Sequence, residues 1–486
     1  MSGLLRLVPG EPEPAHDLAA APAAARTRPR PQWAADPIDA LAEELAEVCA
    51  AAVHPDEIAA VLEADGLTGE QITERYGRGD AFELAAELFA RVPRGHPEPG
   101  PRPDPWKAHP GRFALRALVF TLPGFGYALG APLMTGARDG YGLPAGTGGL
   151  VASALVAWAW NQGLAHRAYL RLASGGRAAA GRCLRGGAPL GAALATAAAF
   201  LAPGIPGVTA FAAGQALYLA AATVLLVLGR ERLLLLTLAP TAAGGILLLV
   251  LPLPSALRIA LLLLTLGGVL GSAAHEIRRT RDDGEKAPAP PALSPLASLP
   301  YGLFGLGCGV LTTLAALGDV LRHSPGATTA GAAVIALTLS MGAAEWLLYR
   351  CRSLALKALA RTTSPRGLLI AVVRVLALCV AGYLGALCVL ALAAGALWQD
   401  GPPLTAPRLS ALLALGAVLW TGLLLQAFGA AWAPAALCLS AAGAETAALT
   451  LDISAPVTVQ LVVCTCTAAA LLAVATGLLG RLTTHR

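Results

Sequence analysis

Six polar side chains within the apolar stretches of this sequence could take part in chemistry. Glu445 lies in the apolar stretch between Cys438 and Thr450, with no other charge within a helical turn, and Arg374 lies about two turns inside another apolar stretch. Because a charge in hydrocarbon is costly, either side chain could contact a substrate or a coupling ion. Alternatively, Arg374 could extend to the membrane surface, and Glu445 could lie at the interface near Asp452.

The other four candidates lie near the ends of two apolar stretches. Asn161, Gln162 and His166 lie near the end of one, and Glu345 occupies the corresponding region of another. An arginine of its own segment, or Arg374 across the bundle, could pair with Glu345 and lower the free energy needed to bury its charge. Alternatively, the Glu345 carboxylate could carry a coupled proton. These four are therefore further candidates for substrate or ion contact.

Sequence motifs for known enzyme chemistry are absent. The sequence contains no Walker-type phosphate loop, no Asp-rich magnesium motif, no helix with paired histidines and no G-x-S-x-G elbow. Nine cysteines occur singly or as the pair Cys464 and Cys466, mostly within apolar segments, which favours packing over disulfides or a metal site. We therefore expect neither an enzyme, nor a cofactor, nor a catalytic or metal-binding residue.

The elements that must position these side chains are membrane helices. The 486 residues are 56% hydrophobic and only 13% charged, with a mean hydropathy of +0.63, whereas about 25% of a soluble domain is charged. The alternating strands of a membrane barrel are not visible. The fold class is therefore all-α, a polytopic bundle of about twelve transmembrane helices of roughly 20 residues each. The segments lie near 113–135, 148–168, 187–203, 208–228, 233–252, 256–274, 298–319, 328–349, 367–397, 409–429, 432–450 and 456–480.

The positions of the arginines predict the orientation of these segments. Predicted cytoplasmic loops carry most of the basic residues, namely Arg171, Arg177, Arg182, Arg185, Arg230, Arg232, Arg278, Arg279, Arg281, Lys286, Arg350, Arg352, Lys357, Arg361 and Arg366. The predicted outer loops carry only Arg138, Arg258, Arg322 and Arg408. Since basic loops stay inside, both termini should be cytoplasmic, with the chain in the plasma membrane among lipids. The net charge of +5 is explained by orientation, without nucleic acid as a partner.

Composition divides the chain into six regions. We expect a disordered Pro- and Ala-rich tail at 1–35, an acidic cytoplasmic helical domain at 36–93 and a Pro-rich linker at 94–111. A first transmembrane bundle at 112–274, a cytoplasmic hinge loop at 275–297 and a second bundle at 298–486 follow. The first residues lack the continuous apolar core of a signal peptide, which again predicts a cytoplasmic N-terminus.

The acidic domain, which we call the head, has the spacing of a small helical bundle. Thr68 and Gln71 have the spacing of a capping box at a helix start. Acidic residues far outnumber basic ones, and the candidates for contact with a basic cytoplasmic protein are Glu43, Glu44, Glu47, Glu83 and Glu87. The alternative is that these charges only keep a small domain soluble.

The membrane region contains a weak twofold repeat when the chain is shifted by about 180 residues, a comparison suggested by the repeats of transporters. Leu122-Pro123-Gly124 lies in the first segment and Leu299-Pro300 opens the seventh. In this arrangement the chain resembles the two six-helix bundles of the multidrug, oligosaccharide-lipid and polysaccharide exporter superfamily, which includes lipid-linked precursor flippases. The stretch GGRAAAGR at 175–182 is similar to a loop motif of the major facilitator superfamily, although the Asp of that motif is absent.

The head resembles the cytoplasmic region of uncharacterised actinobacterial multi-pass membrane proteins. The resemblance rests on HPDEIAAVL at 54–62 and on Tyr76-Gly77-Arg78 before Phe82. Some membrane proteins specific to actinobacteria act in septation and sporulation, so the resemblance implies a role in the cell envelope.

Two functional hypotheses follow. The first is a secondary transporter or a flippase of lipid-linked precursors, working by alternating access on a lipid-linked or small-molecule substrate. The alternative is a non-transporting membrane scaffold for cell division, septation or envelope morphogenesis, which recruits a cytoplasmic partner through the acidic head.

Overall fold

The structure is a computed structural model that describes residues 36–93, 95, 110–282, 294–322, 331–362, 364–397 and 403–479. The predicted tail at 1–35 and most of the predicted linker at 94–111 lie outside these residues, as does the middle of the predicted hinge at 275–297. The described chain is helical, with one isolated antiparallel bridge between Arg138 and Pro144. The prediction of an all-α protein is confirmed.

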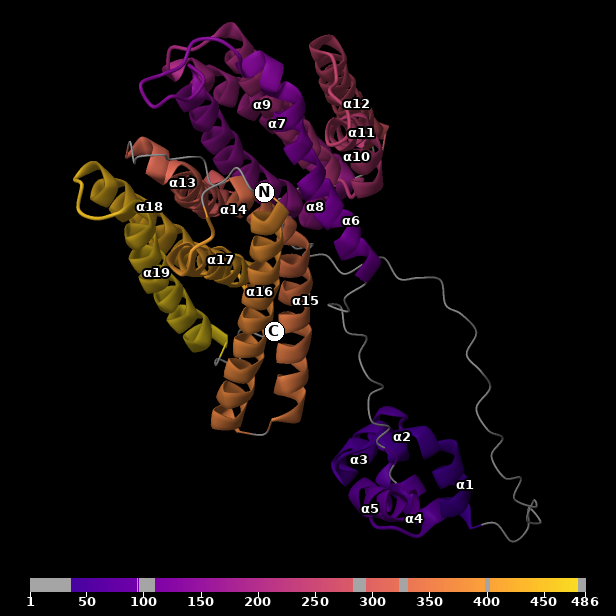
Figure 1. Cartoon of the computed structure of the whole chain (residues 1–486). Coiled ribbons are helices and arrows are strands. Elements are labelled where there is room, and N and C mark those ends of the chain that lie inside the picture. Colours follow the sequence, from indigo (N-terminus) through magenta and orange to yellow (C-terminus); the bar gives the residue numbers. More distant parts are fainter. Residues whose placement is uncertain are drawn as a thin grey trace. The chain divides into compact units, whose positions relative to one another are not determined.

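The head and the membrane region are separate compact units. The head contains α1 (Pro37–Glu44), α2 (Ala46–Ala51), α3 (Pro55–Ala64), α4 (Gly69–Tyr76) and α5 (Ala81–Arg91), drawn in indigo in Figure 1. Its apolar side chains form a buried core of their own. The Thr68 hydroxyl caps α4 by accepting a hydrogen bond from the Gln71 amide, and the Gln71 side chain accepts one from the Thr68 amide, as the capping-box spacing predicts.

The membrane unit runs from α6 to α19. Its first half contains α6 (Pro110–Thr121), α7 (Phe125–Gly130), α8 (Thr147–Ala198), α9 (Pro206–Val227), α10 (Glu231–Thr237), α11 (Ala239–Leu248) and α12 (Ser255–Asp282). Its second half contains α13 (Leu299–Leu321), α14 (Gly331–Leu339), α15 (Met341–Arg361), α16 (Pro365–Leu397), α17 (Ala406–Ala427), α18 (Trp432–Thr450) and α19 (Pro456–Leu479). The short 3-10 helices η2 (Leu122–Gly124) and η3 (Ala131–Met134) flank α7, η4 (Ala199–Leu201) follows α8, and η5 (Pro295–Ser298) precedes α13.

The number of long apolar helices makes the chain a multi-pass membrane protein. Within the described residues, nine helices are long and apolar enough to cross a membrane, and α10 with α11, bent by 46°, form a tenth candidate. These ten coincide with predicted segments, since the second and third segments both fall within one helix, Thr147–Leu201. The predicted eleventh segment coincides with α18, which is not among the ten.

Two predicted loop regions are helical instead. The basic connection that follows the second segment is part of α8, and α15 continues through its basic residues to Arg361. The predicted hinge likewise begins as helix, since α12 extends to Asp282. Long basic side chains can extend into water from a helix that projects beyond the membrane, so a polar connection need not be a loop.

The long helix α8 turns back on itself at two glycines. Gly175 and Gly176 have non-helical dihedral angles, and Gly176 has a φ of 65°. Beyond them, the Trp160 indole donates a hydrogen bond of 2.8 Å to the Gly187 carbonyl. A Cβ at Gly191 would lie 2.1 Å from the Trp160 ring, so the two parts of α8 pack closely side by side. The α8 helix is therefore a hairpin of two helices.

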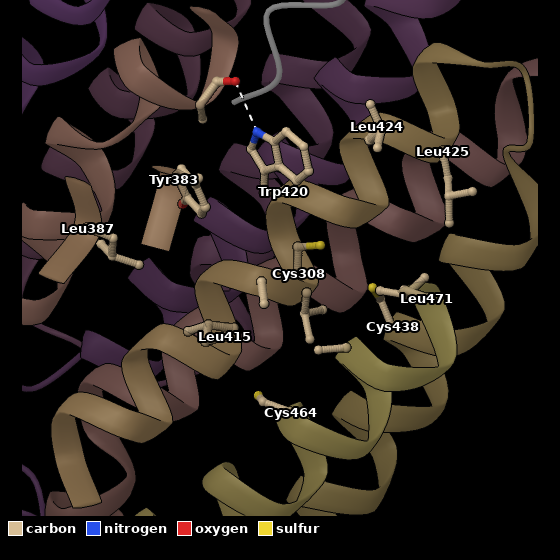
Figure 2. Packing of buried hydrophobic residues seen from close by; sticks show 14 of the residues in the cluster. Cys308, Tyr383, Leu387, Leu415, Trp420, Leu424, Leu425, Cys438, Cys464 and Leu471 are labelled. Carbon is tan, nitrogen blue, oxygen red and sulfur yellow. Dashed lines mark hydrogen bonds between the residues drawn. The ribbon is translucent and has the colours of Figure 1, made fainter. Parts of the chain in front are cut away.

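Each half of the membrane unit has its own apolar core. The larger cluster runs from Phe304 to Ala475 in the second half, and a separate one runs from Val119 to Ala273 in the first. Figure 2 shows part of the second-half core around Trp420, whose indole donates a hydrogen bond of 3.1 Å to the Ala344 carbonyl. Each half is therefore held together by an apolar core of its own.

The same helix neighbours recur in the two halves. The α9 helix contacts α12 as α17 contacts α19, the α11 helix contacts α12 as α18 contacts α19, and α7 contacts α11 as α13 contacts α18. The halves contact each other through α6, which packs on α14 and α15, and through α8, which packs on α13 and η5. In order along each half, the first membrane segment of one half thus contacts the second segment of the other.

Glycines bring α8 and α13 close together. A Cβ at Gly302 would lie 3.1 Å from the Ala159 carbonyl oxygen, and one at Gly305 would lie 2.7 Å from the Gln162 side chain. A Cβ at Gly309 would lie 2.7 Å from the Leu155 side chain. Small residues at such spacing let membrane helices approach closely where lipid provides no hydrophobic drive. We call this contact the glycine seam.

We expect Gly305→Leu to destabilise the protein, because the added side chain must push α8 away from α13. Overpacking typically costs about 1–3 kcal/mol. The measurement is the thermal unfolding midpoint of the purified protein in detergent. The matched control is Gly385→Leu on α16, where a Cβ would meet no atom within 4 Å. Equal midpoints for the two variants would contradict the close packing of the seam.

Candidate functional site

A buried arginine bridges two carboxylates at the contact between the halves. The Arg116 Nε and Nη2 atoms each lie 2.6 Å from Glu231 Oε1, and Arg116 Nη1 donates a hydrogen bond to Glu345 Oε1. The three residues are only 2%, 8% and 6% exposed, respectively. Charge-assisted bonds of this kind are strong in a dry environment. We call Arg116, Glu231 and Glu345 the ionic cluster.

The ionic cluster draws on both halves. Arg116 lies on α6, and Glu231 is the first residue of α10, where the amide groups of a helix N-terminus favour a carboxylate. Gly229, with a φ of 71°, makes the tight turn that precedes it. Glu345 lies on α15, in the other half. One guanidinium therefore bonds to its own half through Glu231 and to the opposite half through Glu345.

A second polar contact between the halves involves His166. Its Nδ1 atom lies 3.1 Å from the Ser298 hydroxyl, and its ring stacks on Tyr301 with centroids 3.6 Å apart and planes at 15°. Gln162, one turn earlier on α8, is also buried and lies against Gly305 of the glycine seam. His166 and Gln162 therefore both lie where α8 meets α13 and η5.

Three of the six predicted membrane candidates lie at the contact between the halves: Glu345, Gln162 and His166. The partner of Glu345 is Arg116, neither Arg374 nor an arginine of its own segment. The neighbouring Asn161 is half-buried on α8, and its Oδ1 atom is buried without a hydrogen-bond partner in the described structure.

The structure separates the other two candidates from this contact. Arg374 is exposed on α16. Glu445 is 1% exposed on α18, inside the second half, and its Oε2 atom has no hydrogen-bond partner within the described residues. No ion pair within the described residues joins Glu445 to Arg374.

Sequence reasoning missed Arg116, Glu231, Ser298 and Tyr301. Arg116 lies within the predicted first segment 113–135, so a charge inside an apolar stretch was the available signal. Glu231 stands between Arg230 and Arg232, where a carboxylate among basic residues is not distinctive. Only the fold brings these residues together with Glu345.

Further ion pairs hold the two ends of the membrane unit. At the end that carries Arg177, Arg230 and Arg350, which we call the basic end, the buried Glu276 accepts hydrogen bonds from Arg230 Nε at 2.8 Å and Arg177 Nη2 at 3.4 Å. At the opposite end, Arg408 lies 2.6 Å from Asp319 and Arg322 pairs with Asp452. Each of these pairs joins segments of a single half: the pairs of Glu276 lie in the first half, and those of Asp319 and Asp452 lie in the second.

In the head, the predicted partner-binding residues differ in their surroundings. Glu43, Glu44 and Glu47 are exposed, whereas Glu87 bonds to Arg78 and to Arg91, with 2.6 Å to the latter. The Glu83 carboxylate is exposed but accepts a hydrogen bond of 2.7 Å from the Gly79 amide. Glu87 therefore has a structural role within the head.

Arg91 ties the first and last helices of the head together. It donates hydrogen bonds to Asp36 at 2.8 Å and Asp39 at 2.7 Å as well as to Glu87. A backbone hydrogen bond from Ile38, followed by the bond from Arg91, lowers the pKa of Asp36 below its usual 3.8. The bond from Arg78, followed by that from Arg91, lowers the pKa of Glu87 below its usual 4.5.

Comparison with family models, curated proteins and solved structures gives no significant match, so the function must be argued from this geometry.

We expect Arg116→Ala to lower the thermal stability of the membrane unit strongly, because it leaves two buried carboxylates without their shared cation. Removing one partner of a buried pair costs about 3–5 kcal/mol. The triple variant Arg116→Met, Glu231→Gln and Glu345→Gln should recover most of this loss, since it buries no charge at these positions. The measurement is thermal unfolding in detergent. A triple variant as unstable as Arg116→Ala would contradict the pairing.

We also expect the head to lose stability in acid. Carboxylates whose pKa is lowered by folding contribute stability above their unfolded pKa, and this stability is lost as the pH falls through the folded pKa. For Asp36 and Glu87 the loss should begin as the pH falls below about 4.5 and continue as it falls further. The measurement is hydrogen exchange of α1 and α5 in the full chain. Arg91→Gln should reduce this acid sensitivity, and unchanged sensitivity would exclude the role of Arg91.

Proposed function

We propose that this protein is a secondary transporter, or a flippase of lipid-linked precursors, in which two six-helix halves rock against each other by alternating access. The observation that carries the proposal is that each half has its own apolar core, while buried polar groups and a glycine seam join the halves. Two halves can separate more easily when polar bonds and small residues join them than when they share one apolar core.

In this transporter the chain would cross the membrane twelve times. The α8 hairpin counts as two, the bent pair α10 and α11 as one, and α18 as one. With 19 residues, α18 would extend about 28 Å, close to the thickness of the hydrocarbon core. The recurring helix neighbours support two halves of equal topology, in which the first segment of each half contacts the second segment of the other.

The basic end would face the cytoplasm, because positively charged connections stay inside. The ionic cluster and the pair of His166 with Ser298 would then close the cytoplasmic side. The α7 helix continues the first membrane segment away from the basic end, and the helices it contacts are α9, α11 and α12 of its own half. The described state would therefore be closed inside, with the opposite ends of the halves less tightly joined.

The substrate would be a small molecule or a lipid-linked precursor that enters between the halves. Gln162 lies in the glycine seam, and Asn161, whose Oδ1 atom is buried without a partner among the described residues, precedes it on α8. They would contact the substrate when the seam opens, since a buried oxygen without a partner, as in Asn161, favours a polar ligand.

A scaffold that recruits a partner is the second candidate, supported by the exposed carboxylates of Glu43, Glu44 and Glu47. Deleting 36–93 should then abolish localisation or partner capture in cells. Under the transporter proposal, the same deletion should leave the motion of the membrane unit intact.

The test of the transporter is a pair of distances measured by electron spin resonance in lipid nanodiscs. Unnatural azido residues carry the spin labels, so that the native cysteines stay unlabelled. One label pair is at the exposed residues Ser174 and Lys357 of the basic end, and the other at the exposed residues Ala137 and Thr405 of the opposite end. We expect Arg116→Ala to populate a longer distance at the basic end and a shorter one at the opposite end.

The control is Glu276→Gln, which alters a buried ion pair within one half and should leave both distances unchanged. A single unchanged distance at each end in Arg116→Ala would contradict the rocking of two halves and would favour the scaffold.

A further inference from the structure

We propose that the ionic cluster is a proton-coupling site, in which Arg116 and a proton compete for the carboxylate of Glu345. This inference rests on the proposed transporter and names its coupling ion. Taking up one proton at Glu345 would release the bond between the halves, and giving it up would restore the bond.

The bonding of Arg116 is asymmetric. Two atoms of its guanidinium, Nε and Nη2, lie at Glu231 of its own half, and one, Nη1, bonds to Glu345 of the opposite half. When the halves separate, Arg116 therefore stays with Glu231, because α6 and α10 belong to the same half and remain in contact. Glu345 is the member that loses its partner.

A carboxylate that loses its cation in a dry site must be neutralised in another way. Glu345 is 6% exposed and bonds to Arg116 alone in the described contacts. An isolated ionised carboxylate in a low-dielectric medium is very costly, and such groups bind a proton instead. A metal ion would need several oxygen ligands, and the described residues contain no group of three His, Cys, Asp or Glu side chains that could hold one.

The exchange balances in charge. Before opening, the Arg116 guanidinium pairs with two carboxylates, so the ionic cluster has a net formal charge of −1, and one proton taken up at Glu345 brings this charge to zero. After opening, a proton from the water at the basic end forms an O–H bond at Glu345, while the guanidinium keeps its charge and its bonds to Glu231. Each opening of the basic end thus takes up one proton from the water at that end. On closing, Arg116 displaces the proton from Glu345, and the proton leaves to the water at the opposite end, which is then open between the halves.

The surrounding groups leave few competitors for this proton. The helices packed against α6 and α15 are α10, α14 and α16. Their charged and titratable residues, with those of α15 itself, are Glu231 and Arg232 on α10 with Arg230 directly before it, Arg366, Arg374, Cys379, Tyr383 and Cys388 on α16, and Tyr349, Arg350, Cys351, Arg352, Lys357 and Arg361 on α15. His166 of α8 lies at the same contact between the halves, and Glu276 of α12 lies at the same end. The α14 helix carries no titratable side chain. The arginines stay charged, and Glu276 is held by Arg230 and Arg177. His166 is the neighbour that ordinarily titrates near neutral pH.

The test measures the distance between labels at Ser174 and Lys357 from pH 8 to pH 5, in the full chain in nanodiscs. In the wild type, acidification should increase the open population. Glu345→Gln should stay open with complete loss of the pH dependence. Glu231→Gln should increase the closed-to-open ratio by about tenfold, because Arg116 then has Glu345 as its remaining cluster carboxylate.

Infrared difference spectra give a second measurement that does not depend on the motion. In a Glu445→Gln background, which removes the other buried carboxyl group without an ion-pair partner, acidification should produce the carbonyl band of a protonated carboxyl group, and Glu345→Gln should remove it. Glu276→Gln, at the same end, should keep both this band and the pH-dependent distance.

The outcomes separate the two proposals. If Arg116→Ala opens the basic end but the wild type does not respond to pH, proton coupling is wrong and the transporter stands. A pH response that persists in Glu345→Gln and disappears in His166→Gln would assign the proton to the imidazole and overturn the proposal. If no variant changes any distance, the rocking of the halves fails, and proton coupling fails with it.

Discussion

The pairing of charge in a low-dielectric interior is the constraint on which the contact between the halves depends. Arg116 is 2% exposed and its two carboxylate partners are nearly as buried, so the guanidinium needs an anion beside it and neither carboxylate could stay ionised there alone. A buried ion pair adds little stability compared with apolar residues of similar volume, but it fixes which groups must meet. The ionic cluster therefore specifies how the two halves pack, while the cores supply the stability within each half.

The division of the core has a mechanical consequence. Apolar packing is dense and does not deform gradually, so each half should move as a body. The glycine seam gives α8 and α13 a close contact, and the bond between His166 and Ser298 lies at one end of it. Directional bonds and small residues at such a contact would allow two discrete arrangements, which is the requirement for alternating access under our proposal.

The sequence allowed the membrane class to be predicted but not the site. Apolar stretches of about 20 residues determine membrane helices locally, because every backbone group must be satisfied within the helix. Glu345 could be identified as a candidate site residue from the same local pattern, because it is a charge near the end of an apolar stretch. Its partner could not, since Arg116 is 229 positions away and the contact depends on how α6 packs on α15. The helical form of the loop after the second segment was missed because charge marks a water-exposed segment without specifying its backbone.

Two buried carboxylates of the membrane unit illustrate why the contact between the halves matters more than burial alone. The sequence favoured Glu445, because no other charge lies within a helical turn of it. In the structure Glu445 is the more deeply buried of the two and has an oxygen without a partner within the described residues. The helices that contact α18 are α13, α17 and α19, which belong to the same half. Under our proposal, rocking of the halves would change little around Glu445, whereas it would remove the cation from Glu345. Because an equilibrium responds only to groups whose interactions differ between its two states, Glu345 and not Glu445 is the carboxylate that can couple a proton to this motion.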